Sequence, residues 1–385
     1  MSILLDFIPF QILGGVGGAA SFTKAVYDEF FRRKPAEVRV LAAYDATLPV
    51  EGRYNCHKIA EAWGVTLIDI STQTLAEVIR REAVNTFFIA IGQFYSRFDL
   101  KGIDCKTIMF IHDIFDVERC DNRIDLILSD KQHESGWKRA KRWINLLSGR
   151  WDRRKEETYQ HIMPLFTAEK TIPYTVSAYS KSALEYFFPQ CKNKVRICYS
   201  PLKEKGCEVG GIQNPQLSSL IEKGKPFLLM LAANRIYKNA ALLMKVFTRL
   251  QNEYPDLHLL TLKYGKSISD RHIDINYLSD SDLEIAYQHA YILVFASFFE
   301  GFGYPPIEAA RYGTPTVASN VTSIPEILGN AGVYFSPFYP SDLYHAIKIM
   351  MEKRDLYVEA AQKRYQEVLK RQQEDLERLI VEILT

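Results

Sequence analysis

The sequence predicts an α/β protein whose parallel sheets are arranged in two domains. Its 385 residues correspond to about two domains of ordinary size. Short apolar runs of β-forming residues alternate with helical segments, which is typical of parallel sheets joined by crossover helices. One such run, 291–296, leads into the loop Glu300-Gly301-Phe302-Gly303 and then into Pro305-Pro306. Because proline suits the first turn of a helix, this stretch predicts a strand, a ligand-binding glycine loop and a helix.

The same patterns predict the other elements. Strands are expected at 3–7, 38–43, 65–70, 86–91, 106–111, 174–177, 194–199, 227–231, 257–262, 275–278, 316–318 and 332–335, and long helices at 19–33, 240–252 and 355–384. The polar, glycine-rich stretch 205–224 predicts a linker between a domain at 1–204 and a domain at 225–365. Residues 366–385 form a separate C-terminal helix in this division, with an apolar stripe of Leu376, Leu379, Ile380, Ile383 and Leu384.

Composition excludes several classes of protein. The formal net charge is +2, so no global field argues for nucleic acid as a partner. The 6 cysteines are scattered without a C-x-x-C pair, which favours reduced thiols over a disulfide framework or a zinc site. The N-terminal apolar run has no basic residues before it and Asp6 interrupts it, which argues against a signal peptide. No apolar run approaches the ~18 residues of a membrane span, so the expected location is cytoplasmic.

The loop at 300–303 has the chemistry of a ligand site. Gly301 and Gly303 allow close approach of the backbone to a ligand, and loop N–H groups with the helix N-terminus favour an anion or a sugar hydroxyl. Glu300 on the loop and Glu308, expected in the first helical turn, can accept hydrogen bonds from hydroxyls. The alternative is that Glu308 only complements the helix dipole and that Glu300 is solvated.

This segment resembles the E-x7-E motif of the family 4 (group 1) glycosyltransferases, with Glu300 and Glu308 as the two glutamates. Other motifs of that family follow the same order along the chain: a first glycine loop at 14–18, His112-Asp113, Thr175-Val176-Ser177 with Ser180-Lys181, and Arg235 with Lys238-Asn239. The resemblance implies the GT-B fold, in which two Rossmann-like domains with parallel sheets face each other across a cleft. It also implies an acceptor-binding N-terminal domain, a nucleotide-sugar-binding C-terminal domain and a final helix that often crosses back to the first domain. The stripe on that helix would equally fit a dimer contact.

The resemblance assigns a role to each matched residue. Lys238 and Arg235 would hold the diphosphate of the donor, Glu300 and His112 would contact its sugar, and Glu308 would bind the ribose hydroxyls. Backbone near Tyr277 and Leu278 would contact the base. His112 and Glu300 are the expected catalytic residues, and the expected donor-binding residues are Gly15, Gly17, Arg235, Lys238, Leu278, Gly301, Phe302, Gly303 and Glu308. Gly15 and Gly17 match the family loosely, and a tight turn without a ligand is the alternative for their loop.

The sequence Asp280-Ser281-Asp282 is formally a D-x-D, a motif that holds metal in a different glycosyltransferase fold. Because an amphipathic segment follows it, helix capping is the better interpretation and no metal is assigned. We expect no metal or other cofactor.

A basic segment at 131–154 carries Trp137, Trp143 and Trp151 among its lysines and arginines. Such a helix suits the surface of an anionic membrane, which would make the protein peripheral on the inner face. An ordinary surface helix with inward-facing tryptophans is the alternative.

The function that the resemblance implies is transfer of a hexose from a nucleotide diphosphate sugar to a glycan or lipid-linked acceptor, with retention at the anomeric carbon and without metal. Family membership suggests bacterial surface polysaccharide synthesis. The sequence Gly303-Tyr304-Pro305-Pro306 is similar to that of mannosyltransferases and favours GDP-mannose, while UDP-hexoses and dTDP-rhamnose stay open. Two other functions stay open: a soluble sugar-phosphate synthase of the same fold and a non-catalytic nucleotide-sugar-binding scaffold.

Overall fold

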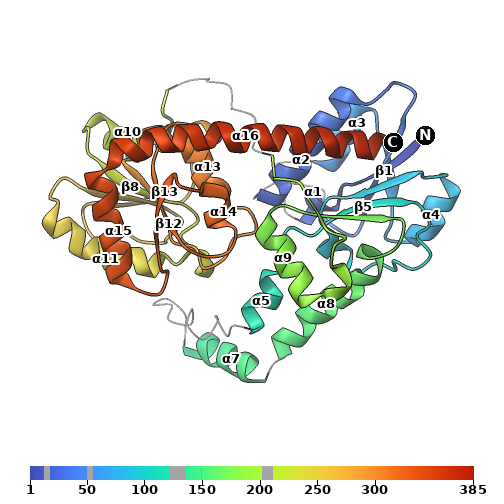
Figure 1. Cartoon of the computed structure of the whole chain (residues 1–385), viewed down its shortest axis with the longest axis horizontal. Coiled ribbons are helices and arrows are strands. Elements are labelled where there is room, and N and C mark those ends of the chain that lie inside the picture. Colours follow the sequence, from blue (N-terminus) through green and yellow to red (C-terminus); the bar gives the residue numbers. More distant parts are fainter. Residues whose placement is uncertain (13–17, 50–54, 122–135, 149, 202–210) are drawn as a thin grey trace. The chain divides into compact units, whose positions relative to one another are not determined.

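The structure is a computed structural model that describes residues 1–12, 18–49, 55–121, 136–148, 150–201 and 211–385. It divides into two compact units (Figure 1). Unit 1 comprises Met1–Asn122, Ile144–Lys203 and Arg371–Thr385, and unit 2 comprises Arg123–Trp143 and Glu204–Lys370. Gly15, Gly17 and Lys131, the first residue of the predicted basic segment, lie outside the described residues, so the roles predicted for Gly15 and Gly17 stay predictions.

Unit 1 is built on a parallel sheet of seven strands in the order β3-β2-β1-β4-β5-β6-β7. The strands are β1 (Ser2–Asp6), β2 (Arg39–Tyr44), β3 (Thr66–Asp69), β4 (Thr86–Ile89), β5 (Lys106–Phe110), β6 (Thr171–Thr175) and β7 (Arg196–Ile197). Its helices are α1 (Ile8–Ile12), α2 (Gly18–Arg33), α3 (Cys56–Trp63), α4 (Leu75–Arg81), η1 (Gly92–Tyr95), α5 (Phe115–Asp121), α8 (Arg150–Phe166), α9 (Ala178–Phe187) and η2 (Pro189–Cys191). Helix α7 (Gly136–Leu147) is divided between the two units.

Unit 2 repeats this architecture with six parallel strands in the order β10-β9-β8-β11-β12-β13. The strands are β8 (Phe227–Met230), β9 (His258–Leu262), β10 (His272–Ile275), β11 (Ile292–Phe295), β12 (Thr316–Ser319) and β13 (Gly332–Phe335). Its helices are α10 (Pro215–Glu222), η3 (Ile236–Lys238), α11 (Ala240–Glu253), α12 (Asp280–His289), α13 (Tyr304–Ala310), α14 (Ile324–Leu328) and α15 (Pro340–Glu352), and α16 (Arg354–Leu384) begins here and ends in unit 1.

Central strands are buried on both faces, which explains their unbroken apolar sequences. All residues of β4, β8 and β11 are buried. In unit 1 the core packs around Leu4, Phe87 and Met109, and in unit 2 one core packs around Leu228 and Val294. The predicted α/β class with two parallel-sheet domains is therefore confirmed.

The strand order of each sheet reverses at one point, between β1 and β4 in unit 1 and between β8 and β11 in unit 2. Strands on the two sides of such a point send their connections to opposite faces of the sheet, and this leaves a space beyond their carboxyl ends where α/β proteins bind ligands. The residues that follow β1, β4, β8 and β11 are therefore the first places to look for function.

Three local predictions differ from the structure. Part of the predicted linker is helix α10, which begins at Pro215 after an Asn214 cap and buries Leu217 and Leu220 in a core of unit 2. Strand β10 ends at Ile275, where the sequence predicted it to begin. The prediction was wrong because the polar residues His272 and Asp274 interrupt the apolar pattern of this strand. Strand β6 begins at Thr171 rather than near Tyr174.

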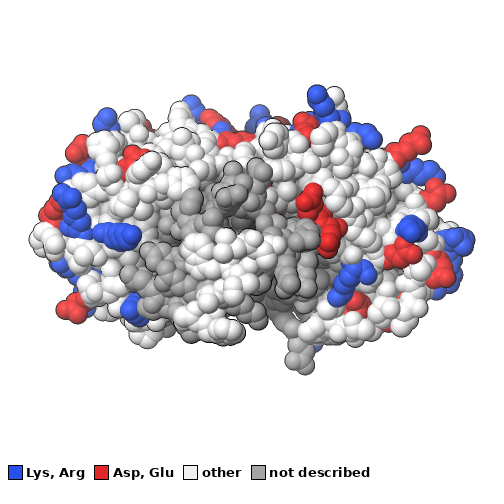
Figure 2. All heavy atoms as spheres, turned by 90° about the horizontal axis from the view of Figure 1, so that it is seen from below, with Lys and Arg blue, Asp and Glu red and all other residues white. Residues whose placement is uncertain are grey.

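Charge on the surface is mixed in sign. Figure 2 shows both basic and acidic side chains on one face of the molecule, in keeping with a net charge of only +2. Among the described residues, none of the helices has both the length and the apolar character needed to cross a bilayer.

Candidate functional site

Two charged side chains meet at the point where the sheet of unit 2 reverses its order. Lys238 ends the short helix η3 that follows β8, and Glu300 lies on the loop that follows β11. The Lys238 Nζ donates to Glu300 Oε1 at 2.5 Å. Their side chains are only 9% and 13% exposed, so this is a largely buried ion pair.

The surroundings of the pair hold both groups in place. Ser297 Oγ donates to the same Glu300 Oε1 at 2.6 Å, and the Glu300 amide donates to Thr322 Oγ1 at 3.1 Å. The Lys238 ammonium lies 4.6 Å from the centre of the Phe295 ring, within the range of a cation–π contact. Lysine, glutamate, serine and aromatic ring therefore form one preorganised cluster.

The glycine loop is fixed from the opposite side by the chain that follows β12. Ser323 Oγ donates to the carbonyls of Glu300 at 2.8 Å and Phe302 at 3.1 Å. Gly303 has a φ of +91°, a left-handed conformation that favours glycine. It precedes α13, and Pro305 and Pro306 lie in the first turn of that helix as predicted.

Glu308 lies in the second turn of α13, not in the first turn as the sequence analysis expected, because the helix begins at Tyr304. A residue one turn further along the helix is less well placed to complement the dipole. Its carboxylate accepts a hydrogen bond from the Tyr287 hydroxyl at 2.6 Å. Burial, and then the charge of Glu308, raise the pKa of Tyr287 well above its usual value, so the tyrosine stays a donor.

The other predicted donor-binding residues of unit 2 are more peripheral to this cluster. Arg235 is exposed and donates to the Tyr237 hydroxyl at 2.9 Å. The side chain of Leu278 is buried in a hydrophobic core, so only its backbone is suited to contact a ligand. Asn239 adopts a left-handed φ of +59° and its side chain donates to the Pro337 carbonyl at 2.9 Å, which sets the start of α11.

The sequence Asp280-Ser281-Asp282 begins α12. Ser279 is the N-cap and accepts from the Asp282 amide at 3.1 Å. The Asp282 carboxylate in turn accepts from the amides of Gln213 and Asn214 at 2.9 and 3.1 Å. These contacts bear out the interpretation of this sequence as a helix start.

In unit 1, His112 lies just beyond the carboxyl end of β5. Its Nε2 lies 2.9 Å from the Ala90 carbonyl oxygen, and the Phe22 ring packs against it edge-on with centroids 4.7 Å apart. Burial lowers the pKa of His112 to about 4. The imidazole is therefore neutral at pH 7, with Nε2–H donating to the carbonyl and Nδ1 as an acceptor.

Ser177, in the T-V-S-x-x-S-K sequence, caps a helix. It is the N-cap of α9 and accepts from the Ser180 amide at 3.1 Å. Asp113 accepts from the Phe115 amide at 3.1 Å at the start of α5. Both contacts are local and structural.

Sequence reasoning missed four residues that shape these places: Ser297, Phe295, Tyr287 and Ala90. The first two stand at the carboxyl end of the strand that carries the loop, and this position was a usable signal for Ser297. Tyr287 and Ala90 act across large separations in sequence, so no local pattern pointed to them.

What the cluster in unit 2 can do follows from its charges. An ammonium held at a strand end beside a glycine loop can stabilise an anion, and a carboxylate has about four lone-pair positions for donors such as hydroxyls. The site is therefore suited to a ligand with both an anionic group and hydroxyl groups.

Comparison with known proteins finds a family match for part of unit 2. Residues 216–367 match the family model for glycosyl transferases group 1. This part of the chain thus resembles the group 1 glycosyl transferases. Among curated proteins of Escherichia coli, O-antigen chain mannosyltransferase B is 48% identical over 63 residues, 16% of this chain and 16% of that protein. The serotype-specific mannosyltransferase WbdA is 35% identical over 144 residues, 33% of this chain and 17% of that protein. The matches thus span about a sixth of the length of these relatives.

The fold extends over the whole chain. The structure of HepE from Anabaena in complex with UDP-glucose superposes with a TM-score of 0.63 at 14% identity, covering 98% of this chain and 99% of that chain. The two parallel-sheet units thus have the GT-B fold that the sequence analysis expected. Lys238, Glu300 and Glu308 all lie within the family match.

Proposed function

We propose that the protein is a glycosyltransferase that moves a hexose from a nucleotide diphosphate sugar to a glycan or a lipid-linked acceptor. The observation that carries the proposal is the buried Lys238–Glu300 pair at the reversal point of unit 2, inside the segment that matches the group 1 family. A cation and a carboxylate fixed side by side suit a donor with a diphosphate at one end and a sugar at the other.

The proposed chemistry follows from where charge develops. An acceptor oxygen bonds to the anomeric carbon while the bond from that carbon to the diphosphate oxygen breaks, so negative charge grows on the leaving phosphate. Lys238 stabilises that charge, with Arg235 and the backbone amides of Gly301, Phe302 and Gly303 in support. The acceptor proton passes to the leaving phosphate oxygen, which places attack on the face of departure and retains configuration. The lysine supplies the positive charge in this proposal, so no metal is invoked.

The remaining site residues have proposed roles that follow the family resemblance. Glu300 accepts hydrogen bonds from the donor sugar, and Glu308, held by Tyr287, binds the ribose hydroxyls. His112 contacts the sugar as a neutral imidazole, and the backbone at Leu278 contacts the base.

For the donor we propose GDP-mannose. The support is that two relatives are mannosyltransferases: the O-antigen chain mannosyltransferase B at 48% identity and the serotype-specific mannosyltransferase WbdA at 35% identity. HepE, whose structure holds UDP-glucose, is a reason to keep UDP-hexoses in the test. Bacterial surface polysaccharide synthesis is the corresponding proposal for the pathway class.

The experiment that tests the function is a thermal-shift panel of GDP, UDP and dTDP, each with and without EDTA. A ligand that binds only the folded state at 100 times its dissociation constant adds roughly 2.7 kcal/mol. We expect GDP to raise the melting temperature equally with and without EDTA. The Lys238→Met variant should lose this shift, and Lys245→Met, which removes an exposed lysine of α11, should keep it. If none of the three nucleotides stabilises the protein, the assignment of this cluster as the donor site is wrong.

Turnover is the second test. With the donor found in the panel, Glu300→Ala should lose most of its turnover, by at least about a hundredfold if the carboxylate contacts the reacting sugar, and should keep a folded circular dichroism spectrum. Near-normal turnover in this variant contradicts the role of Glu300. Donor hydrolysis or transfer by the unmodified protein excludes a non-catalytic scaffold.

A further inference from the structure

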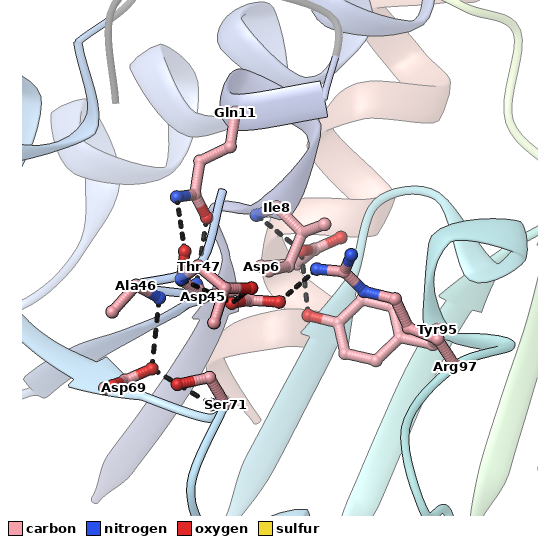
Figure 3. Close-up of polar contacts among 10 residues, drawn as sticks. All are labelled: Asp6, Ile8, Gln11, Asp45, Ala46, Thr47, Asp69, Ser71, Tyr95 and Arg97. Atoms are coloured by element: carbon pink, nitrogen blue, oxygen red, sulfur yellow. Dashed lines mark hydrogen bonds and ion pairs between the residues drawn. The ribbon is translucent and has the colours of Figure 1, made fainter. Parts of the chain in front are cut away.

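The strongest unassigned feature is a polar cluster at the point where the sheet of unit 1 reverses its order. Figure 3 shows Asp6 in this cluster, with Ile8 and Tyr95 beside it. Asp6 ends β1, and β4, which pairs with β1 across the reversal point, ends just before Ala90. Asp6 is completely buried, and a buried carboxylate needs several donors to offset its lost hydration.

Asp6 finds those donors on both sides of the reversal point. Its Oδ1 accepts from the Tyr95 hydroxyl at 2.8 Å and from the Ile8 amide at 3.0 Å, and its Oδ2 accepts from the Ala90 amide at 3.2 Å. Burial raises the pKa of Asp6 to about 7, while hydrogen bonds from Tyr95 and from the backbone of Ile8, Ile91 and Ala90 oppose the rise. The carboxylate therefore ties down the backbone at 90–91.

The same stretch of backbone carries the group that orients His112. The carbonyl of Ala90 accepts from His112 Nε2 at 2.9 Å, and this carbonyl belongs to the peptide that joins Ala90 to Ile91. A carbonyl can only accept, so its position selects the tautomer with the proton on Nε2 and leaves Nδ1 as an acceptor. Asp6 is the last residue of β1, and Ala90 and His112 follow the neighbouring strands β4 and β5, so this series of contacts runs directly across the sheet.

We propose that Asp6, with Tyr95, is a positioning residue that holds the 90–91 backbone so that the Ala90 carbonyl fixes His112 in its Nε2–H tautomer. Only the expected effect on kcat rests on the proposed function, because that function gives His112 a contact with the donor sugar. An Nδ1 acceptor in a fixed place can receive a hydrogen bond from a sugar hydroxyl. In the other tautomer Nδ1 is a donor instead, and in a tilted ring the acceptor is no longer within reach of the hydroxyl. Asp6 itself touches no substrate.

The test is nitrogen-detected NMR of the histidine rings in the full chain at pH 8, with the His112 signals assigned by their loss in His112→Gln. Three variants are compared: Asp6→Asn, Tyr95→Phe and, as control, Asp69→Asn. An asparagine at position 6 replaces one acceptor oxygen by an NH2 group, so it cannot accept from Ala90 and from Ile8 and Tyr95 together. Tyr95→Phe removes a single hydroxyl and guards against an Asp6 variant that does not fold. Asp69 also accepts two backbone amides at a strand end, those of Ala46 and Ser71, but does not contact Ala90.

In the unmodified protein we expect one Nε2–H form of His112. In Asp6→Asn we expect a mixture of tautomers, in Tyr95→Phe a smaller change, and in Asp69→Asn no change. With the donor identified, kcat of Asp6→Asn should fall on the order of tenfold while KM for the donor stays within about twofold, because the ring is displaced rather than removed. Unchanged His112 signals in folded Asp6→Asn and Tyr95→Phe overturn the proposal. Altered signals in a protein without transferase activity support the positioning role and contradict only the proposed function.

Discussion

At the residue scale, the Lys238–Glu300 pair is the most consequential contact of the structure. Both side chains are largely buried, so each charge has lost most of its hydration and is stabilised mainly by the opposite charge of its partner. The contact with Ser297 and the Phe295 ring adds to the lysine–carboxylate attraction. A site of this kind is rigid before ligand arrives, which lowers the cost of binding an anion there.

Removal of one partner of the pair should therefore destabilise the protein. We expect Lys238→Met to lower the free energy of unfolding by about 3 kcal/mol, because it leaves the Glu300 carboxylate buried without its cation. The double variant Lys238→Met, Glu300→Met should recover part of that loss. Urea denaturation of Lys238→Met, Glu300→Met, the double variant and Lys245→Met measures these differences. A double variant that loses the sum of the two single effects contradicts the pairing.

His112 gives stability a pH dependence. Its folded pKa is about 4, below the ordinary 6.5, because of burial. Between pH 6.5 and pH 4 the unfolded chain binds a proton that the folded chain does not, so the folded state loses stability as pH falls through this window. Asp6, with its raised pKa, titrates in the opposite sense, because its buried carboxyl favours the folded state as pH falls from about 7.

The histidine effect can be isolated by substitution. We expect the unmodified protein to lose about 2 kcal/mol relative to His112→Gln between pH 7.5 and pH 5, since a pKa difference of one unit is worth about 1.4 kcal/mol. Asp6 is present in both proteins, so its contribution cancels. The measurement is denaturant unfolding of both proteins at several pH values, and a constant difference across the range would show that His112 is not held neutral by the fold.

At the element scale, the end of α16 is an integral part of unit 1. Asp375 Oδ2 accepts from the Tyr199 amide at 2.9 Å, and the Tyr174 hydroxyl donates to Glu382 Oε2 at 2.5 Å. Arg196 forms an ion pair with Glu382. The apolar stripe identified in the sequence supplies Leu379, Ile380 and Ile383, all fully or almost fully buried. These three side chains of the stripe are thus buried within this chain, as expected for a final helix that contacts the first domain.

A substitution within the stripe should destabilise unit 1. Leu379→Ala should cost about 2–5 kcal/mol in the free energy of unfolding, the usual range for a buried leucine. Val381 lies on the same helix turn but is 58% exposed, so Val381→Ala should change stability by less than about 0.5 kcal/mol. Chemical denaturation followed by circular dichroism distinguishes the two, and equal effects would contradict the packing of this helix end.

At the scale of the whole molecule, α7 has an apolar face that is exposed to solvent. Trp137, Ile144 and Leu147 are 76%, 60% and 78% exposed, and their spacing of seven and three residues puts them on one side of the helix. Lys138, Arg139, Lys141 and Arg142 lie between them in the sequence. Trp137 faces outward, contrary to the alternative of inward-facing tryptophans, whereas Trp143 is half-buried. We propose that this face binds an anionic membrane. Such binding would bring the protein to a lipid-linked acceptor, and it would argue against the alternative function of a soluble sugar-phosphate synthase.

Vesicle co-sedimentation tests this proposal. The unmodified protein should sediment with vesicles of anionic phosphatidylglycerol and much less with neutral phosphatidylcholine. Replacement of Trp137, Ile144 and Leu147 by serine should weaken binding by at least about tenfold, since burial of each side chain contributes on the order of 1 kcal/mol or more. Leu356→Ser, which removes an exposed leucine of α16, is the control. Equal binding to both lipids, or no effect of the triple substitution, contradicts the membrane role.

Several features of this protein were determined by the sequence alone. The alternation of β and helical patterns predicted the two parallel-sheet domains, and the run from 291 to 303 predicted the strand, loop and helix that carry Glu300. The start of α12 was also predicted. These features share a physical cause, because they depend on residues within about ten positions of one another, and local propensity, periodicity and turn chemistry act over that range.

Only the tertiary structure decided which distant residues meet. The pairing of Lys238 with Glu300 joins residues 62 positions apart, and that of Asp6 with Ala90 joins residues 84 positions apart. Each pair forms because two strands that are remote in sequence lie next to each other where the sheet reverses its order. Strand order depends on how whole elements pack and on the handedness of their connections. No local pattern contains that information, so the sequence named the charged residues of the site but not their partners.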